Sequence, residues 1–327
     1  MITNTATAIA SPNIAMVKYW GNRDQHLRLP SNGSISFNLE GLFTRTRVTI
    51  DTRLASDVLI LNNKKVTGQG LQRVQAMLEE VRGMAGTNLH AEIQSENNFP
   101  GSAGIASSAS AFAALAMAAS TAAGLSLSQA ELSRLARHGS GSACRSIPGG
   151  FVEWQAGRED EDSFAFSIAA PEHWKLIDCI AIISSEQKTT GSSEGHALAD
   201  SSPLQAARVE DAPRRLELCR RAILERDFPS LADVVELDSN LMHSVMMTSR
   251  PALFYYQPAT FTIMEAVRGW RHGGLPACYT IDAGPNVHVI CPQDNCAKIA
   301  EKLEALDGVR QVLTAPVGGP ARLVCEG

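Results

Sequence analysis

The fold is decided by one stretch of small residues, Pro100-Gly101-Ser102-Ala103-Gly104-Ile105-Ala106-Ser107-Ser108-Ala109. Alternating residues at 90–95 predict a strand before this stretch, and the Ala-rich segment 103–123 predicts a buried helix. Small residues let a backbone approach a ligand closely, and the free N–H groups of a helix N-terminus favour an anion. The Gly-Lys-Ser/Thr ending of a P-loop is absent. The stretch therefore predicts either a phosphate-binding helix start or a tightly packed helix without a ligand.

Working outward, the hydrophobic pattern predicts a mixed α/β chain whose texture changes near residue 185. A length of 327 residues fits two domains at about 150 residues each, and we place them at 1–185 and 186–327. Strands are expected at 9–17, 35–39, 44–50, 57–61, 151–154, 176–183, 277–282, 287–291 and 309–314. Further helices are expected at 71–81, 132–137, 203–224, 228–247, 259–271 and 297–306.

Composition excludes several classes of function. The 29 Lys and Arg against 34 Asp and Glu give a net charge of -5, which argues against a nucleic-acid-binding surface. The apolar stretch 103–123 is mostly Ala and Ser, so no membrane span is expected. The first residues show no basic region before an apolar core, and the seven scattered cysteines complete no zinc pattern. We expect a cytoplasmic protein with reduced thiols and no nucleic-acid or membrane partner.

Four blocks, in the expected order, resemble one known family. Pro-x-x-x-Gly-Ile-x-Ser-Ser-Ala is similar to the phosphate-binding motif of the GHMP kinase superfamily. Three further blocks resemble the mevalonate diphosphate decarboxylases within it: Asn13-Ile14-Ala15-Met16-Val17-Lys18-Tyr19-Trp20-Gly21, Gly139-Ser140-Gly141-Ser142-Ala143-Cys144-Arg145-Ser146, and Asp282-Ala283-Gly284-Pro285-Asn286. Four blocks together are far more specific than any one of them.

This resemblance implies a fold and a reaction. The fold would be the two-domain GHMP α/β (α+β) architecture, with a ribosomal-S5-like N-terminal domain and a ferredoxin-like C-terminal domain. The activity would be the ATP-dependent decarboxylation of a 5-phosphorylated mevalonate in isoprenoid biosynthesis, with ATP and Mg²⁺ as cofactors. The small-molecule substrate would lie between the domains, and family members are commonly homodimers.

Three residues are the candidates for catalysis. Asp282 ends an apolar strand before Gly284-Pro285, where an Asp taken alone is more often a turn residue. Arg145 carries a planar fork suited to a carboxylate, although a surface ion pair would also explain it. The resemblance implies that Asp282 acts at the 3-hydroxyl, that Arg145 binds the C1 carboxylate, and that Lys18 binds a phosphate or the reacting centre.

The resemblance also implies the binding residues around them. Arg73 falls on the charged side of an amphipathic helix, where a solvated role is nearly as natural as a place in the substrate pocket. The substrate-binding candidates are Tyr19, Asn22, Ser36, Arg73, Ser140, Gly141, Ser142 and Ser192. The nucleotide-binding candidates are Asn97, Asn98, Pro100, Gly101, Ser102, Gly104, Ala106, Ser107 and Ser108, with Ser107 also a candidate Mg²⁺ ligand.

One position departs from the family pattern and bears on the substrate. Family members usually read Lys-Tyr-Trp-Gly-Lys, where the second lysine helps hold the terminal phosphate, but this chain has Asn22. The loss of a charge-assisted contact of about 1.5–3 kcal/mol favours 5-phosphomevalonate and isopentenyl phosphate over the diphosphate pair. The first fifty residues nevertheless hold five basic residues against two acidic ones, which leaves cations for an anionic substrate.

Three other functions compete with this interpretation. The classical reaction on mevalonate 5-diphosphate is the nearest alternative. A kinase of the same superfamily, such as a mevalonate 3-kinase, would form ADP without CO₂. A non-catalytic nucleotide-binding regulator would have a damaged phosphate loop or lack the catalytic acid, and this sequence shows neither.

Overall fold

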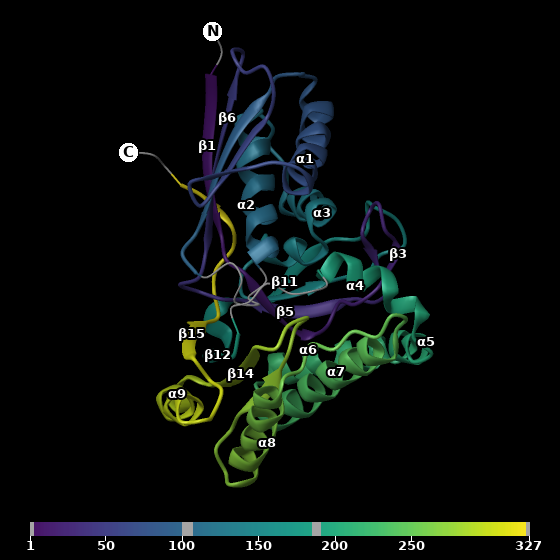
Figure 1. Cartoon of the computed structure of the whole chain (residues 1–327), viewed down its shortest axis with the longest axis vertical. Helices are drawn as coiled ribbons and strands as arrows, with labels where there is room; N and C mark the ends of the chain where they lie inside the picture. The colour runs from purple at the N-terminus through teal and green to yellow at the C-terminus, as the bar shows by residue number, and fades with distance from the viewer. Residues whose placement is uncertain (1–2, 100–106, 185–190, 325–327) are drawn as a thin grey trace.

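The computed structural model describes residues 3–99, 107–184 and 191–324. Figure 1 shows two regions along the long axis, one built on a large sheet and one rich in helices. The predicted α/β (α+β) two-domain class is confirmed.

The first region is a six-stranded sheet with helices packed on one face. Its strand order is β16-β1-β6-β9-β7-β8, in which only β7 and β9 pair in parallel. Helix α2 packs on β1 and β6, and an Ala-rich core lies between them (Figure 1). The strands are β1 (Thr3–Ala10), β6 (Thr44–Asp51), β7 (Val58–Leu61), β8 (Lys64–Val66), β9 (Ala91–Asn97) and β16 (Arg322–Leu323). The helices are α1 (Gln69–Ala85), α2 (Ser107–Ala122) and α3 (Gln129–Gly139).

A second sheet lies between this region and the helices below it. Its order is β11-β10-β5-β2, and its strands pack on α6 and α7 through one apolar core. Its strands are β2 (Asn13–Val17), β5 (Ser34–Asn38), β10 (Phe151–Trp154) and β11 (Ala165–Ala169). A short hairpin, β3 (Asn22–Asp24) with β4 (Leu29–Pro30), follows β2, and the 3-10 segments are η1 (Gly141–Ser146), η2 (Pro171–His173), η3 (Ala199–Ser201) and η4 (Gln293–Asn295).

The third sheet has the order β13-β14-β12-β15 and is covered by helices of the second half. Its strands are β12 (Leu176–Ile182), β13 (Cys278–Thr280), β14 (Val287–Pro292) and β15 (Gln311–Pro316). The helices are α4 (Ser192–Leu198), α5 (Gln205–Glu210), α6 (Ala212–Glu225), α7 (Phe228–Thr248), α8 (Pro258–His272) and α9 (Cys296–Glu304).

Strand pairing links the two halves of the chain. β12 precedes the predicted boundary at residue 185, yet it pairs with β14 and β15. The chain also returns at its end, where β16 pairs with β1. The boundary between 1–185 and 186–327 stays a prediction, and each half contributes a strand to a sheet of the other.

Proline explains two differences from the predicted elements. The single strand expected at 9–17 is two strands in different sheets, β1 and β2, because Pro12 interrupts the ladder and its carbonyl accepts the Leu39 N–H at 2.9 Å. The single helix expected at 203–224 is divided into α5 and α6. Pro213 lies in the first turn of α6, where its missing N–H costs nothing.

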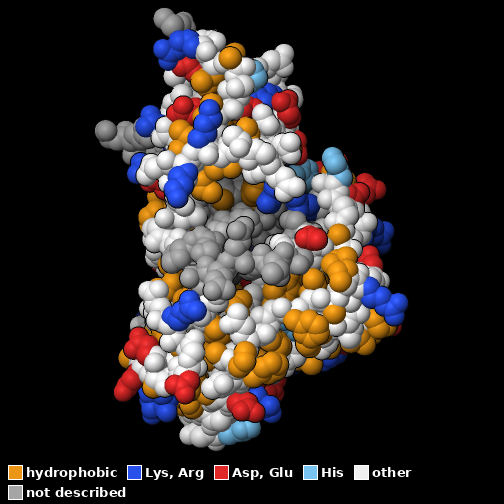
Figure 2. Space-filling view, in the orientation of Figure 1, with side chains coloured by type: hydrophobic (Ala, Val, Ile, Leu, Met, Phe, Trp, Pro, Cys, Tyr) orange, Lys and Arg blue, Asp and Glu red, His pale blue; other side chains and the backbone are white. Residues whose placement is uncertain are grey.

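The remaining features of the fold are its lack of membrane-spanning helices in the described residues, its free thiols and its exposed hydrophobic side chains. In the described part of the chain, no helix is long and apolar enough to cross a membrane. Six described cysteines are free thiols. Figure 2 shows hydrophobic side chains gathered over the half that holds α7 and α8, and Phe254 and Phe261 are 73% and 53% exposed. The homodimer stays a prediction.

Candidate active site

Asp282 lies in the short connection between β13 and β14, and the surrounding structure fixes that connection. Ile281, just before it, donates its N–H to Ser239 Oγ of α7 at 3.0 Å. Asn286, just after it, accepts the N–H groups of Ile183 and Ser184 at 2.7 and 3.1 Å. The apolar strand that predicted Asp282 at a rim therefore ends in a turn with a defined backbone.

The carboxylate of Asp282 meets a cation from the other end of the sequence. Lys18 Nζ donates to Asp282 Oδ1 at 2.6 Å, and the two side chains are 2% and 27% exposed. Burial alone would raise the pKa of Asp282, but the charges of Lys18, His288 and Arg145 outweigh burial and lower it to about 2. Asp282 is thus an ionised hydrogen-bond acceptor at neutral pH.

A buried ion network holds the backbone of Lys18. The Lys18 backbone N–H donates to Asp238 Oδ1 of α7 at 2.7 Å. The Lys18 carbonyl accepts from Arg208 Nη2 at 2.8 Å and from Asn32 Nδ2 at 3.0 Å. Asp238 Oδ2 in turn accepts from Arg215 Nε at 2.7 Å, with both side chains fully buried. Asp238, Arg208 and Arg215 are not among the predicted site residues, because no local motif links α5, α6 and α7 to β2.

Arg145 is a buried cation whose described partners are all neutral. Its Nε donates to Asn13 Oδ1 at 3.2 Å and to Ser36 Oγ at 3.1 Å, and its Nη1 donates to Ser34 Oγ at 2.6 Å. Burial lowers its pKa, although Asp282 contributes an opposing effect. Among the described residues it forms no ion pair, and Nη2 has no hydrogen-bond partner. This arrangement fits a guanidinium held ready for a carboxylate ligand and argues against a surface ion pair.

Tyr19 stands beside this centre and is closely enclosed. Its ring stacks on His196 of α4 at 4.1 Å, and a Cβ added at Gly141 would lie 2.6 Å from it. Its hydroxyl donates to Asn22 Oδ1, and Asn22 Nδ2 donates to Gln25 Oε1 at 2.9 Å. The single hydroxyl proton of Tyr19 is therefore engaged, so Tyr19 can donate to a phosphate only by releasing Asn22.

The remaining predicted substrate residues have different hydrogen-bond partners in the structure. Ser140 Oγ is 3.3 Å from Ser108 Oγ, so the residue just before η1 contacts the start of α2. The Ser142 carbonyl accepts from Asn13 Nδ2 at 3.1 Å. Arg73 is exposed, and its Nη2 donates to the Gly139 carbonyl at the end of α3 at 3.0 Å. Ser192 is exposed at the first position of α4, and its predicted role stays a prediction.

On the nucleotide side, the structure describes part of the predicted set. Asn97 Oδ1 accepts from Thr44 Oγ1, and Asn98 Oδ1 accepts from the Phe43 N–H, both at 2.7 Å. These amides therefore tie the end of β9 to the start of β6. Helix α2 begins with Ser107 and Ser108. Pro100, Gly101, Ser102, Gly104 and Ala106 lie outside the described residues.

A helix start with two hydroxyls fits the phosphates of a nucleotide and a Mg²⁺ ion that keeps phosphate and water ligands. In residues 3–99, 107–184 and 191–324, no group of three His, Cys, Asp or Glu side chains could hold a metal. A Mg²⁺ ion here would therefore depend on substrate oxygens together with a hydroxyl such as that of Ser107.

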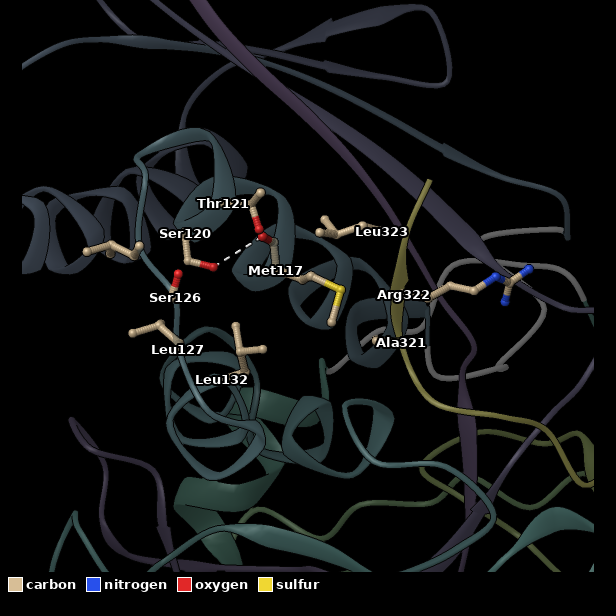
Figure 3. Close-up of a pocket in the computed structure, with 10 residues that line it drawn as sticks. Met117, Ser120, Thr121, Ser126, Leu127, Leu132, Ala321, Arg322 and Leu323 are labelled. Carbon is tan, nitrogen blue, oxygen red and sulfur yellow. Dashed lines mark hydrogen bonds between the residues drawn. The ribbon is translucent and has the colours of Figure 1, made fainter. Parts of the chain in front are cut away.

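A pocket at the other end of α2 is separate from these groups. Figure 3 shows Met117 of α2 near Leu323 of β16, while the Arg322 side chain extends away from α2. The sixteen residues of α2 span about 24 Å at 1.5 Å per residue, which separates this pocket from Ser107 and Ser108. It contains none of the predicted site residues.

Both halves of the chain match known proteins. Residues 10–165 match the family model of the diphosphomevalonate decarboxylase-like N-terminal domain, and residues 179–316 match the mevalonate 5-diphosphate decarboxylase C-terminal domain. The diphosphomevalonate decarboxylase of Candida albicans is 38% identical, over 98% of this chain and 95% of that protein.

Two solved structures are also similar over nearly their whole length. The mevalonate diphosphate decarboxylase of Staphylococcus aureus has a TM-score of 0.94 at 36% identity, covering 99% of this chain and 98% of that one. A structure described as MDDEF in complex with MVAPP, AMPPCP and magnesium has a TM-score of 0.93 at 36% identity, covering 99% of both chains.

Proposed function

The chain belongs to the mevalonate diphosphate decarboxylase family of the GHMP superfamily, and on that premise we propose that it decarboxylates mevalonate 5-diphosphate to isopentenyl diphosphate. It is an ATP-dependent decarboxylase that uses Mg²⁺. Asn22 in the sequence favours 5-phosphomevalonate, but the names of the relatives and the complex with MVAPP support the diphosphate alternative better.

One observation carries the proposal: an ionised carboxylate, Asp282, is paired with a buried lysine and lies in the field of a buried arginine without a described counter-ion. An alcohol and a carboxylate on one substrate satisfy these groups together. Asp282 accepts a hydrogen bond from the 3-hydroxyl, and Arg145 binds the C1 carboxylate through its free donors.

The chemistry then follows from charge. ATP with Mg²⁺ supplies the phosphoryl group that turns the 3-hydroxyl into a leaving group. Asp282 takes the hydroxyl proton as the O–P bond forms, and Lys18 balances the charge of its carboxylate. Cleavage of the C1–C2 bond releases CO₂ and provides the electron pair of the new C2–C3 double bond as phosphate leaves C3. Arg145 orients the carboxylate until it departs.

Its low pKa makes Asp282 a weak base, and this determines at which step of the reaction Asp282 accepts the proton. A strong general base has a pKa near the working pH, whereas that of Asp282 is about 2. Proton transfer to Asp282 therefore becomes favourable only once the hydroxyl oxygen bonds to phosphorus and its own acidity rises. Before that point Asp282 acts by orientation.

A second candidate, decarboxylation of 5-phosphomevalonate, is favoured by one observation. Asn22 is neutral, buried and bonded to Tyr19 and Gln25, so position 22 offers no charge to a second phosphate. This candidate predicts a site with too few cations for a diphosphate.

Kinetics with ATP, Mg²⁺ and each substrate in turn test the proposal. We expect kcat/KM for mevalonate 5-diphosphate to exceed that for the monophosphate by about tenfold or more, a difference of about 1.4 kcal/mol. A preference of the same size for the monophosphate would overturn the proposal and support the second candidate.

A further inference from the structure

The hairpin β3–β4 carries a cation, Arg28, that belongs to none of the family motifs. Arg28 lies in its turn with a left-handed φ of 49°. The turn is fixed on both sides of that residue: Arg28 Nε donates to the His138 carbonyl at 2.9 Å, and Arg137 Nε donates to the Leu27 carbonyl at 3.0 Å. The Arg28 guanidinium is thus placed by the end of α3.

Arg73 reaches the neighbouring carbonyl of the same helix. Its Nη2 donates to Gly139 at 3.0 Å, one residue beyond the carbonyl that Arg28 binds, and its guanidinium lies 4.9 Å from the Phe112 ring centre. Two cations converge on the last two carbonyls of α3, where the helix dipole is negative. Within the described ranges, neither forms an ion pair with a carboxylate.

The field of Arg28 extends to the enclosed aromatic pair described above. Burial lowers the pKa of His196 to about 3, with Arg28 the next cause, and burial raises the pKa of Tyr19 while Arg28 opposes it. Desolvation lowers the pKa of Arg73, and Arg28 lowers it further. Arg28 is the charged neighbour that these three residues share.

His196 adds a neutral donor to the same place. Its Nδ1 accepts the Gly21 N–H at 3.0 Å, so the ring proton lies on Nε2. A neutral donor, two cations without described carboxylate partners and Tyr19 together favour an anion with several oxygens.

We propose that Arg28, with Arg73 beside it, binds the terminal phosphate of the 5-diphosphate and supplies the positive charge that is missing at Asn22. This inference rests on the proposed function, since it assigns a residue to the distal end of that substrate. It answers the second candidate directly, because the cation comes from the turn of the hairpin and not from its first strand.

The matched comparison is Arg28→Gln against Arg23→Gln. Both residues lie on the same hairpin, but Arg23 Nη2 donates to the Ala156 and Gly157 carbonyls at 3.0 and 2.6 Å, whereas Arg28 donates to the His138 carbonyl. We expect Arg28→Gln to lower kcat/KM for the diphosphate by about tenfold to a hundredfold, chiefly through KM. We expect the monophosphate to change by less than about threefold, and Arg23→Gln to change neither.

Two further variants separate charge from folding. Arg28→Lys keeps the charge and should retain most of the diphosphate activity. The double variant Asn22→Lys with Arg28→Gln restores a cation at a residue that contacts the Tyr19 hydroxyl, and it should recover the activity lost in Arg28→Gln. A folded double variant without recovery, judged by thermal unfolding, would overturn the charge role, as would an Arg28→Gln effect no larger than that of Arg23→Gln.

Binding of inorganic pyrophosphate tests Arg28 without turnover. Calorimetry should show pyrophosphate binding weakened about tenfold or more by Arg28→Gln but unchanged by Arg23→Gln. Equal affinities in the three proteins would overturn the inference even if the wild type decarboxylates mevalonate 5-diphosphate. A wild type inactive on both substrates would instead overturn the proposed function, while the pyrophosphate result still decides the role of Arg28.

Discussion

The reactive centre, formed by Lys18, Asp282 and Arg145, differs in its charge balance from the outer region, formed by Arg28 and Arg73. At the centre, Lys18 is neutralised by Asp282, and its backbone is held by a network that reaches Asp238. In the outer region, Arg28 and Arg73 donate hydrogen bonds only to neutral carbonyls among the described residues. The comparison teaches that the centre is organised for geometry, whereas the outer region is organised for affinity to a charged group.

The largest effect should come from breaking the centre at Asp282. Asp282→Asn keeps the size of the side chain but removes both the proton acceptor and the counter-charge of Lys18. We expect kcat to fall by about 10³-fold while the affinity for ATP stays nearly unchanged. Single-turnover kinetics and nucleotide binding measure the two quantities, and an active Asp282→Asn protein would remove Asp282 from the chemistry.

The network behind Lys18 should matter for folding as well as rate. Asp238→Asn leaves Arg215 and Arg208 buried with less compensation, and breaking a buried pair costs about 3–5 kcal/mol. Urea unfolding should show that loss, and kcat should fall in the fraction that remains folded. Asp227→Asn is the matched control, because Asp227 is a partly exposed N-cap of α7 that accepts hydrogen bonds from Ser230. Asn caps a helix about as well as Asp, so this variant should lose less than about 0.5 kcal/mol. Equal losses in the two variants would show that Asp238 is only a surface-like contact.

Arg145 links the two regions, because its charge acts on both Asp282 and Tyr19. Arg145→Ala removes the donors for the substrate carboxylate, so we expect kcat/KM to fall by about a hundredfold, with KM raised and kcat lowered together. Steady-state kinetics in a folded variant test this. A variant that loses only stability would make Arg145 a structural residue.

The smallest expected effect is the response to pH, which should differ between the two regions: kcat reports on the centre and KM on the outer region. Asp282 is ionised above its pKa of about 2, and His196 is neutral above its pKa of about 3, so kcat should be flat between about pH 5 and 8. The terminal phosphate gains its second charge near pH 6, so KM should fall as pH rises through about 6. The pair of Asp282 with Lys18 stabilises the fold above the ordinary Asp pKa of 3.8, and that contribution is lost only as pH falls through about 2. A kcat that titrates near pH 6 would contradict this division.

The sequence predicted the centre better than the outer region, for a physical reason. Lys18, Arg145 and Asp282 each stand in a local block, and each block must keep a particular turn or strand end to present its side chain. Arg28 and His196 come from a hairpin turn and a helix with no motif of their own. The excess of basic residues in the first fifty was the one signal that pointed toward Arg28.

The fold shows the same limit. Hydrophobic periodicity predicted α7 and α8 to within a residue or so, but it merged β1 with β2 and α5 with α6. In both cases apolar residues continue across the break, and only the missing N–H of a proline marks it. Periodicity also cannot show that β16 returns to β1, because that pairing joins the two ends of the chain.

The central claim is that Asp282 and Arg145 couple phosphoryl transfer to loss of CO₂ on mevalonate 5-diphosphate. The most direct test is the ratio of CO₂ released to ADP formed when the wild-type protein turns over that substrate with ATP and Mg²⁺. We predict one CO₂ for each ADP, with isopentenyl diphosphate as the product. Formation of ADP without CO₂ would contradict the account and identify a kinase.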